Sequence, residues 1–76
     1  MDIKYVVIEH SGNQSIILFP AWILHKEMLK IGKITSAGFI DLENKRCYGY
    51  STSLKLKSNQ KEDNLLLKLL LNKKEE

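Results

Sequence analysis

The chain begins with two strand-like runs separated by a turn signal. Ile3–Glu9 (IKYVVIE) and Ser15–Phe19 (SIILF) are rich in β-branched and aromatic residues, which predicts two strands. Gly12 and Asn13 predict the central pair of a two-residue hairpin turn between them. The resulting register pairs His10 with Ser15, Ile8 with Ile17 and Val6 with Phe19. Because both faces of this hairpin are apolar, we expect the sheet to be covered on both sides.

A helix is predicted to follow the first hairpin. Pro20 suits a first helical turn, where its missing N–H has no partner to lose, and Gly32 suits the position beyond the last turn. Between them, Ala21–Ile31 (AWILHKEMLKI) gathers apolar side chains on one helical face. The residues expected to face the core are Ala21, Leu24, Met28 and Ile31, with Trp22 and Leu29 beside them. Ile23 falls on the opposite, polar face.

A second hairpin is predicted downstream. Ile34–Leu42 (ITSAGFIDL) and Cys47–Ser58 (CYGYSTSLKLKS) predict two strands. The connection is either a two-residue turn centred on Asn44 and Lys45, which sets the register below, or a longer loop. The even positions of the second strand begin bulky, and we expect the core to contain Tyr48, Tyr50, Leu54 and Leu56. One face of the predicted register pairs Phe39 with Tyr50, Asp41 with Tyr48 and Ala37 with Thr52. The other face pairs Ile40 with Gly49, Gly38 with Ser51 and Ser36 with Ser53.

The last segment predicts a helix with more leucine than one sheet needs. Asn59 and Glu62 resemble a capping box, and Asp63 adds negative charge to the first turn. The leucines of LLLKLLL spread over an arc of roughly 240°, whereas packing on one sheet needs little more than about 100°. We therefore expect the helix to pack against a second copy. The expected interface residues are Leu65, Leu66, Leu67, Leu69, Leu70 and Leu71.

These elements predict a single small α+β domain over residues 1–76. The predicted order is β-β-α-β-β-α, with a mainly antiparallel four-stranded sheet and two helices, assembled as a homo-oligomer. The 76-residue chain has one cysteine, so it cannot form an internal disulfide, and no Cys/His cluster has zinc-site spacing. A net charge of +3, with both signs interspersed, makes a nucleic-acid partner less favoured.

The sequence also predicts the compartment. No apolar run approaches the roughly 20 residues of a membrane span, so no membrane partner is expected. Met1 and Asp2 lead directly into a strand-like run without a secretory signal, and the lone thiol of Cys47 suits a reducing compartment. We expect a cytoplasmic protein.

Catalytic chemistry is weakly supported. His25 lies in the apolar arc of the first helix, where it is either a general base or, as we favour, a core histidine bonded to a backbone oxygen. No serine or cysteine nucleophile is visibly paired with it. Asp41 and Glu43 lie so near a turn that solvation is the better interpretation. The prediction is a protein that is not an enzyme and has no cofactor or metal.

The small face of the second hairpin is the best candidate for a binding site. Its glycines allow close approach, its hydroxyls donate to phosphate oxygens and its lysines supply charge. Equally, small residues let a helix or a second subunit pack close. An aromatic ring could stack on a base, with Trp22 and Tyr48 as candidates. The predicted ligand-binding residues are Trp22, Ser36, Gly38, Tyr48, Gly49, Ser51, Ser53, Lys55 and Lys57.

SAGFIDL followed by CYGYSTSLKLKS, with ILFP before and a leucine-rich end, resembles a group of small, mostly uncharacterised proteins of tailed phages and prophages. The resemblance implies a protein that counteracts host defence. It is most compatible with an oligomeric sponge that sequesters the cyclic nucleotide signals of CBASS immunity. The alternatives are an inhibitor that binds a host defence protein, in the manner of an anti-CRISPR, or a small phage regulator. A third is a nucleic-acid-binding accessory protein.

Overall fold

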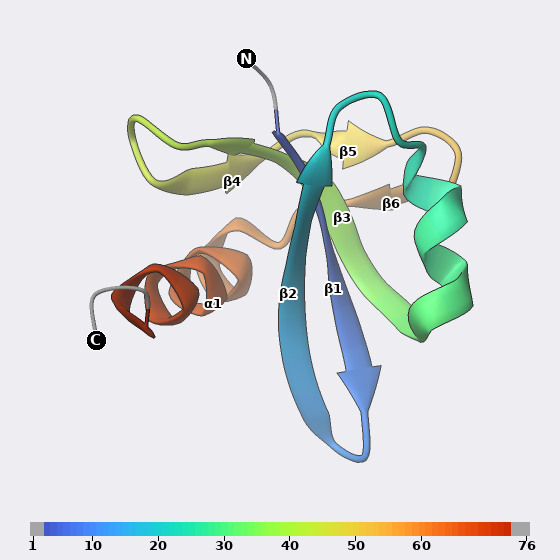
Figure 1. Cartoon of the computed structure of the whole chain (residues 1–76), viewed down its shortest axis with the longest axis horizontal. Helices are drawn as coiled ribbons and strands as arrows, with labels where there is room; N and C mark the ends of the chain where they lie inside the picture. Colours follow the sequence, from blue (N-terminus) through green and yellow to red (C-terminus); the bar gives the residue numbers. More distant parts are fainter. Residues whose placement is uncertain (1–2, 74–76) are drawn as a thin grey trace.

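The computed structural model describes residues 3–73, which form two antiparallel sheets and two helices (Figure 1). The larger sheet has the strand order β2-β1-β3-β4, and the smaller sheet pairs β5 with β6. The elements are β1 (Ile3–His10), β2 (Asn13–Pro20), the 3-10 helix η1 (His25–Ile31), β3 (Lys33–Asp41), β4 (Arg46–Tyr48), β5 (Tyr50–Ser51), β6 (Leu56–Lys57) and α1 (Gln60–Lys73). The predicted α+β class, with a four-stranded antiparallel sheet and two helices, is confirmed.

The first hairpin is confirmed, but its turn is one residue earlier than predicted. Ser11 and Gly12 form the turn, with positive φ values of 52° and 79°, so His10 pairs with Asn13. Both residues thus adopt the backbone that favours a type I′ turn, which matches the twist of the flanking strands. The predicted register was wrong by two residues, as Val6 pairs with Ile17 and not with Phe19. A slip of two residues keeps every side chain on its predicted face.

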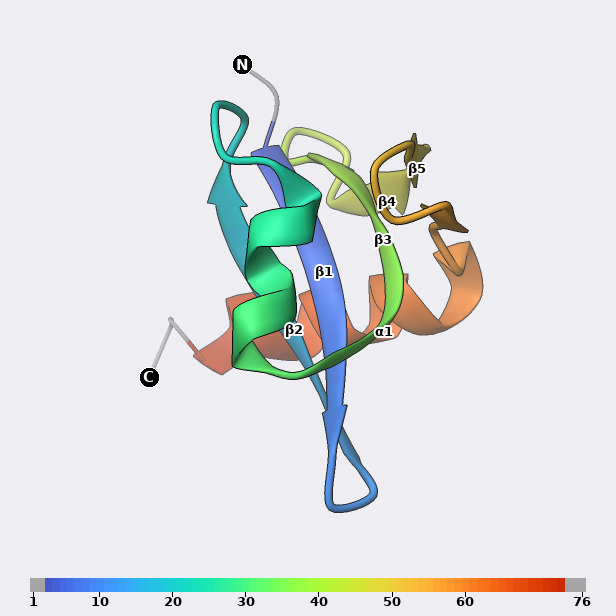
Figure 2. The same cartoon turned by 90° about the vertical axis from the view of Figure 1, so that its right-hand side faces the viewer.

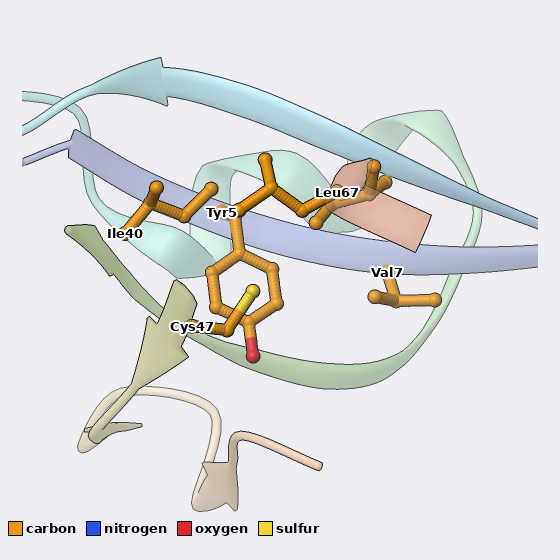
Figure 3. Packing of buried hydrophobic residues seen from close by; sticks show 6 residues of the cluster. Tyr5, Val7, Ile40, Cys47 and Leu67 are labelled. Carbon is orange, nitrogen blue, oxygen red and sulfur yellow. The ribbon is translucent and has the colours of Figure 1, made fainter. Parts of the chain in front are cut away.

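Both faces of the sheet are covered, as the apolar hairpin predicted. Figure 2 shows η1 in front of the sheet and α1 behind it. On the α1 side, one buried cluster consists of Tyr5, Val7, Ile16, Ile40, Cys47 and Leu67 (Figure 3). On the η1 side, a second cluster consists of Val6, Ile8, Phe19 and Ala37. Each face of β1 therefore lies in a separate apolar layer.

The helix predicted over Ala21–Ile31 was wrong at its start. Pro20 ends β2, where it pairs with Ile3, and its carbonyl accepts the Ile23 N–H at 3.1 Å in a turn. Leu24 is extended (φ −77°, ψ 141°), so the helix begins only at His25. It ends before Gly32, as predicted. The short helix does not bury the whole predicted apolar face. Met28 packs on the η1-side cluster as predicted, and Ile23, predicted on the polar face, packs there too. The exposed residues of this segment include Trp22, Leu24, Leu29 and Ile31.

The single strand predicted over residues 47–58 was also wrong. Gly49 has a positive φ of 78° and separates β4 from the small β5–β6 sheet. The connection from β3 to β4 is longer than a two-residue turn, so Phe39 pairs with Tyr48 and Asp41 with Arg46. This slip is again two residues and keeps the predicted faces of β3 and β4. Because the chain turns at Gly49, the alternation beyond it no longer describes one flat strand.

Helix α1 buries only part of its leucine arc. Leu67 is fully buried in its own domain, so its predicted role at an interface was wrong. Three others, Leu66, Leu70 and Leu71, pack at the edge of the same cluster. Leu65 and Leu69 stay 59% and 61% exposed. Of the helices within residues 3–73, neither has the length and apolar character needed to cross a membrane.

Candidate functional site

A hollow lies between the β5–β6 hairpin, the start of β3 and the start of α1, and we name it the β5–β6 groove. Figure 2 shows that hairpin above the first turn of α1. The groove has a volume of about 1260 Å³. Its lining residues are Thr35, Ser36, Gly49, Tyr50, Ser51, Thr52, Lys55, Leu56, Lys57, Ser58, Asn59 and Gln60. Two of these are cationic and none is acidic, so the lining favours an anion.

The groove is formed by a short hairpin that leaves the main sheet at Gly49 and returns at Ser58. After Gly49 the chain runs out through β5 and returns through β6, and the Ser58 N–H donates to the Gly49 carbonyl at 2.9 Å. The loop between the strands is fixed by the Ser51 hydroxyl, which accepts the Leu54 N–H at 3.2 Å. Lys55 follows with a positive φ of 56°. This hairpin thus brings Lys55 and Lys57 into the groove lining, together with Asn59 and Gln60 at the start of α1.

Five of the nine predicted ligand-binding residues line the groove: Ser36, Gly49, Ser51, Lys55 and Lys57. The hydroxyl groups of the two serines are not free to bind a ligand. Ser36 is buried and donates to Asp63 at 2.9 Å, and Ser51 is 1% exposed with its hydroxyl bonded within the loop. Both serines therefore shape the floor, and the accessible polar groups are those of the lysines, Thr52, Ser58 and the amide side chains.

The other four predicted residues lie outside the groove. Gly38 is covered by the Tyr48 carbonyl and the Tyr5 ring, which leave no room for a Cβ. Tyr48 stacks on Phe39 with 5.8 Å between ring centroids and an angle of 28°. Ser53 is exposed, within 3.3 Å of the Ser51 hydroxyl. Trp22 is 80% exposed on the turn before η1, among no groove residues.

Tyr50 is the main groove residue that sequence reasoning missed. Alternation along an unbroken strand placed it in the core, but it lines the groove and is 62% exposed. The signal was Gly49: a glycine between two tyrosines marks a place where a strand can bend. Thr35, Thr52, Ser58, Asn59 and Gln60 were missed for the same reason, because they come together only when the hairpin folds back.

A buried carboxylate lies beneath the groove. Asp63 is 2% exposed and accepts hydrogen bonds from the Tyr5 hydroxyl at 2.5 Å, the Ser36 hydroxyl at 2.9 Å and the Asn59 N–H at 2.9 Å. It thereby satisfies the N–H that the predicted capping box assigned to Glu62. Burial and the bond to Asp63 raise the pKa of Tyr5 well above its usual value. Burial and the nearby Asp63 charge also raise the pKa of Cys47 to about 11.

This network sets where an anion can bind. Ser36 and Asn59 line the groove and bond to the Asp63 carboxylate, so the floor beneath them is negative. Lys55 and Lys57 are exposed on the hairpin. A phosphate is therefore favoured on the hairpin side, away from the floor.

His25 is a core residue, as favoured from the sequence. It is 4% exposed, and its Nε2–H donates to the Gly38 carbonyl at 2.9 Å. Phe19 and Phe39 meet its ring edge-on, with centroids 5.5 and 5.7 Å away. Burial lowers the pKa of His25, which keeps the imidazole neutral. Among residues 3–73, no three His, Cys, Asp or Glu side chains are grouped to hold a metal ion.

Comparison with protein-family models, curated proteins and solved structures gave no match. The resemblance to phage proteins stays a prediction.

Proposed function

We propose that this protein is a non-catalytic binding protein that holds a phosphorylated ligand, most concretely a cyclic nucleotide, in the β5–β6 groove. One observation carries the proposal: the groove combines two lysines, free hydroxyl groups and an exposed tyrosine ring, with no acidic lining residue. Lys55 and Lys57 supply charge for phosphate oxygens, and Thr52 and Ser58 supply hydroxyl donors. Tyr50 offers a flat apolar surface for a nucleobase.

A binding role without turnover is supported by the positions of the reactive groups. The Cys47 thiol is buried and its pKa is raised, so little thiolate forms near neutral pH. His25 is bonded to a carbonyl in the core. Neither residue lines the groove. In the setting implied by the phage resemblance, such a protein acts as a sponge that sequesters a host's cyclic nucleotide immune signal.

Calorimetric titration with a panel of cyclic di- and trinucleotides tests this function. We expect saturable binding, with the ligand recovered unmodified on heating. Tyr50→Ala removes the stacking surface without touching the core, and should weaken binding about 5- to 150-fold, since stacking is worth about 1–3 kcal/mol per base. Lys57→Glu should abolish binding. Lys26→Ala, on η1, is the matched control and should leave the affinity unchanged.

No binding across the panel would overturn the proposal. Turnover of the ligand would replace the sponge by an enzyme. Affinity for single-stranded nucleic acid that falls steeply with salt would favour the nucleic-acid alternative.

We propose protein–protein inhibition as a second candidate function, favoured by the surface around η1. This surface exposes the apolar residues Trp22, Leu24, Leu29 and Ile31. Exposed Lys26 and Lys30 lie among them in the chain and exposed Lys33 follows, so that these cations outnumber the one exposed acidic residue of the segment, Glu27. Apolar anchors beside cations suit a partner with an apolar surface and acidic rim, and tryptophan is enriched at binding hot spots.

Inhibition of purified host defence complexes tests the second candidate. Trp22→Ala should abolish inhibition, whereas Tyr50→Ala should leave it intact. The opposite pattern would assign the activity to the groove.

A further inference from the structure

The two edges of the main sheet differ in their protection. Strand β4 forms one edge; it has three residues, includes Arg46, and leads directly into the bend at Gly49. Strand β2 forms the other edge and is eight residues long. Its sequence NQSIILFP contains no charged residue, and its one proline is the last residue. Short length, charge and bends are the usual devices that keep an edge unpaired, and β2 has none of them in its interior.

The hairpin geometry shows which backbone groups of β2 point outward. A two-residue turn makes His10 and Asn13 a hydrogen-bonded pair, and such pairs alternate along an antiparallel ladder. Asn13, Ser15, Ile17 and Phe19 therefore bond to β1. Gln14, Ile16 and Leu18 direct their N–H and C=O groups away from it. Pro20 fits this alternation, because its missing N–H would also point outward.

Within the described residues, β1 is the only strand paired with β2. The outward groups lie in a row over Gln14–Leu18. Such a row is a template for one more antiparallel strand.

We propose that β2 pairs with β2 of a second copy, antiparallel and centred on Ile16, and joins the two main sheets into one. In this register Gln14 faces Leu18 of the partner subunit, and Ile16 faces Ile16 of the partner subunit. These pairs form about six backbone hydrogen bonds. The even-numbered side chains of both strands lie on one common face, so the α1 layers of the two copies lie on the same side of the joined sheet.

The composition of β2 favours a second copy over a foreign peptide. A two-fold axis brings a strand against itself, so a charged residue near its centre would meet its own like charge. β2 is uncharged along its whole length and meets no such repulsion. The cross-strand pairs in this register are also compatible. Half-buried Ser15 faces Ile17 of the partner subunit, and Gln14 covers Leu18 of the partner subunit. The pairing is independent of the β5–β6 groove, which no β2 residue lines.

Backbone amide exchange, measured residue by residue by NMR at two protein concentrations, tests the pairing. We expect the amides of Gln14, Ile16 and Leu18 to gain at least about tenfold protection as the concentration rises through the dimer range. Those of Ser15, Ile17 and Phe19 should be protected throughout, because they bond to β1. Sedimentation velocity on the same samples should show the monomer giving way to a dimer.

Gln14→Pro supplies the matched perturbation. Gln14 is exposed and its N–H points outward, so proline costs no bond to β1 but removes a donor at each end of the joined ladder. We expect a monomer. Gln14→Thr keeps the N–H and should stay dimeric. If Gln14→Pro does not fold, the exchange pattern of the unmodified chain still decides.

Three outcomes would overturn the proposal. One is a monomer at every concentration. Another is a dimer whose outward β2 amides still exchange rapidly, which would place the interface elsewhere. The third is protection of these amides only when a foreign extended peptide is added.

Discussion

Replacing Asp63 should remove a buried hydrogen-bonded link between α1 and the sheet. The carboxylate is 2% exposed and accepts bonds from Tyr5 on β1, Ser36 on β3 and the Asn59 backbone. Hydrogen bonds to a charged group contribute about 1.5–3 kcal/mol each, and a buried donor left without a partner costs about 1–3 kcal/mol. Allowing for the desolvation cost that Asp63 itself carries, we expect Asp63→Ala to lower the free energy of unfolding by about 3–5 kcal/mol.

That loss is a large share of the total stability. At about 0.05–0.15 kcal/mol per residue, a chain of 76 residues has about 4–11 kcal/mol. Asp63→Asn keeps the shape but turns one acceptor into a donor, so its loss should be smaller, about 1–3 kcal/mol. The ranking of the two variants therefore tests the hydrogen bonds separately from the packing.

Urea unfolding followed by far-UV circular dichroism measures these losses. Glu62→Gln is the matched control, because Glu62 is the exposed neighbour in the same helical turn, and its change should stay within about 0.5 kcal/mol. A loss below about 1 kcal/mol for Asp63→Ala would refute the reasoning. An equal loss for Glu62→Gln would show that helix charge, and not the buried network, carries the effect.

Three further predictions concern the core. Burial raises the pKa values of Tyr5 and Cys47, so the folded state favours the neutral phenol and thiol, and stability should fall as the pH rises above about 9–10. The thermal midpoint should fall over this pH range, and should fall less steeply in Tyr5→Phe. Because burial lowers the pKa of His25, stability should also fall below about pH 6.5, and His25→Asn should flatten this acid limb. Gly38→Ala should cost about 2 kcal/mol or more in urea unfolding, since its Cβ would meet the Tyr48 carbonyl; an unchanged midpoint would contradict the close approach.

The sequence predicted which side chains share a face better than it predicted which residues pair. Hydrophobic alternation predicted the faces of β1, of β2 and of the β3–β4 pairs correctly, because a two-residue slip conserves them. It failed at the start of β3, where a bulge in the β1–β3 ladder places Ile34 in the η1-side cluster. The registers depended on turn position. The first turn was misplaced by one residue, since it uses Ser11 and Gly12, and of the two alternatives for the second connection the longer loop is the one formed. In a short segment with several small or polar residues, more than one pair can occupy the central turn positions, and the local sequence does not decide between them.

The groove could be predicted only in part for a related reason. Lys55, Lys57 and Gly49 were identified as binding candidates from their chemistry. The helix before β3 and the strand after β4 were misassigned, because tertiary contacts overrode the local periodicity. A buried His25 held by the Gly38 carbonyl fixes η1, and the bend at Gly49 turns the chain back on itself. Tyr50, predicted in the core, consequently lines the groove, and Trp22, predicted in the binding site, lies exposed outside it.

The exposed leucines of α1 form a second surface through which two copies could assemble, and the free energy gained by burying them can be compared with the cost of association. Only Leu65 and Leu69 remain substantially exposed, since the others pack on their own domain. Burying two leucines gains at most about 3–6 kcal/mol per copy, or about 6–12 kcal/mol per dimer, and less here because each is already partly covered. Association costs about 4–15 kcal/mol in lost freedom alone, so this pair is a weak sole interface.

We therefore expect Leu69→Lys to leave the assembly intact in sedimentation velocity, while Gln14→Pro dissolves it. Leu69 is exposed, so the charge should cost the monomer little stability. If Leu69→Lys instead gave monomers and Gln14→Pro stayed dimeric, the leucine arc would be the interface. The excess of leucine in α1 would then serve a partner copy, as the sequence first indicated.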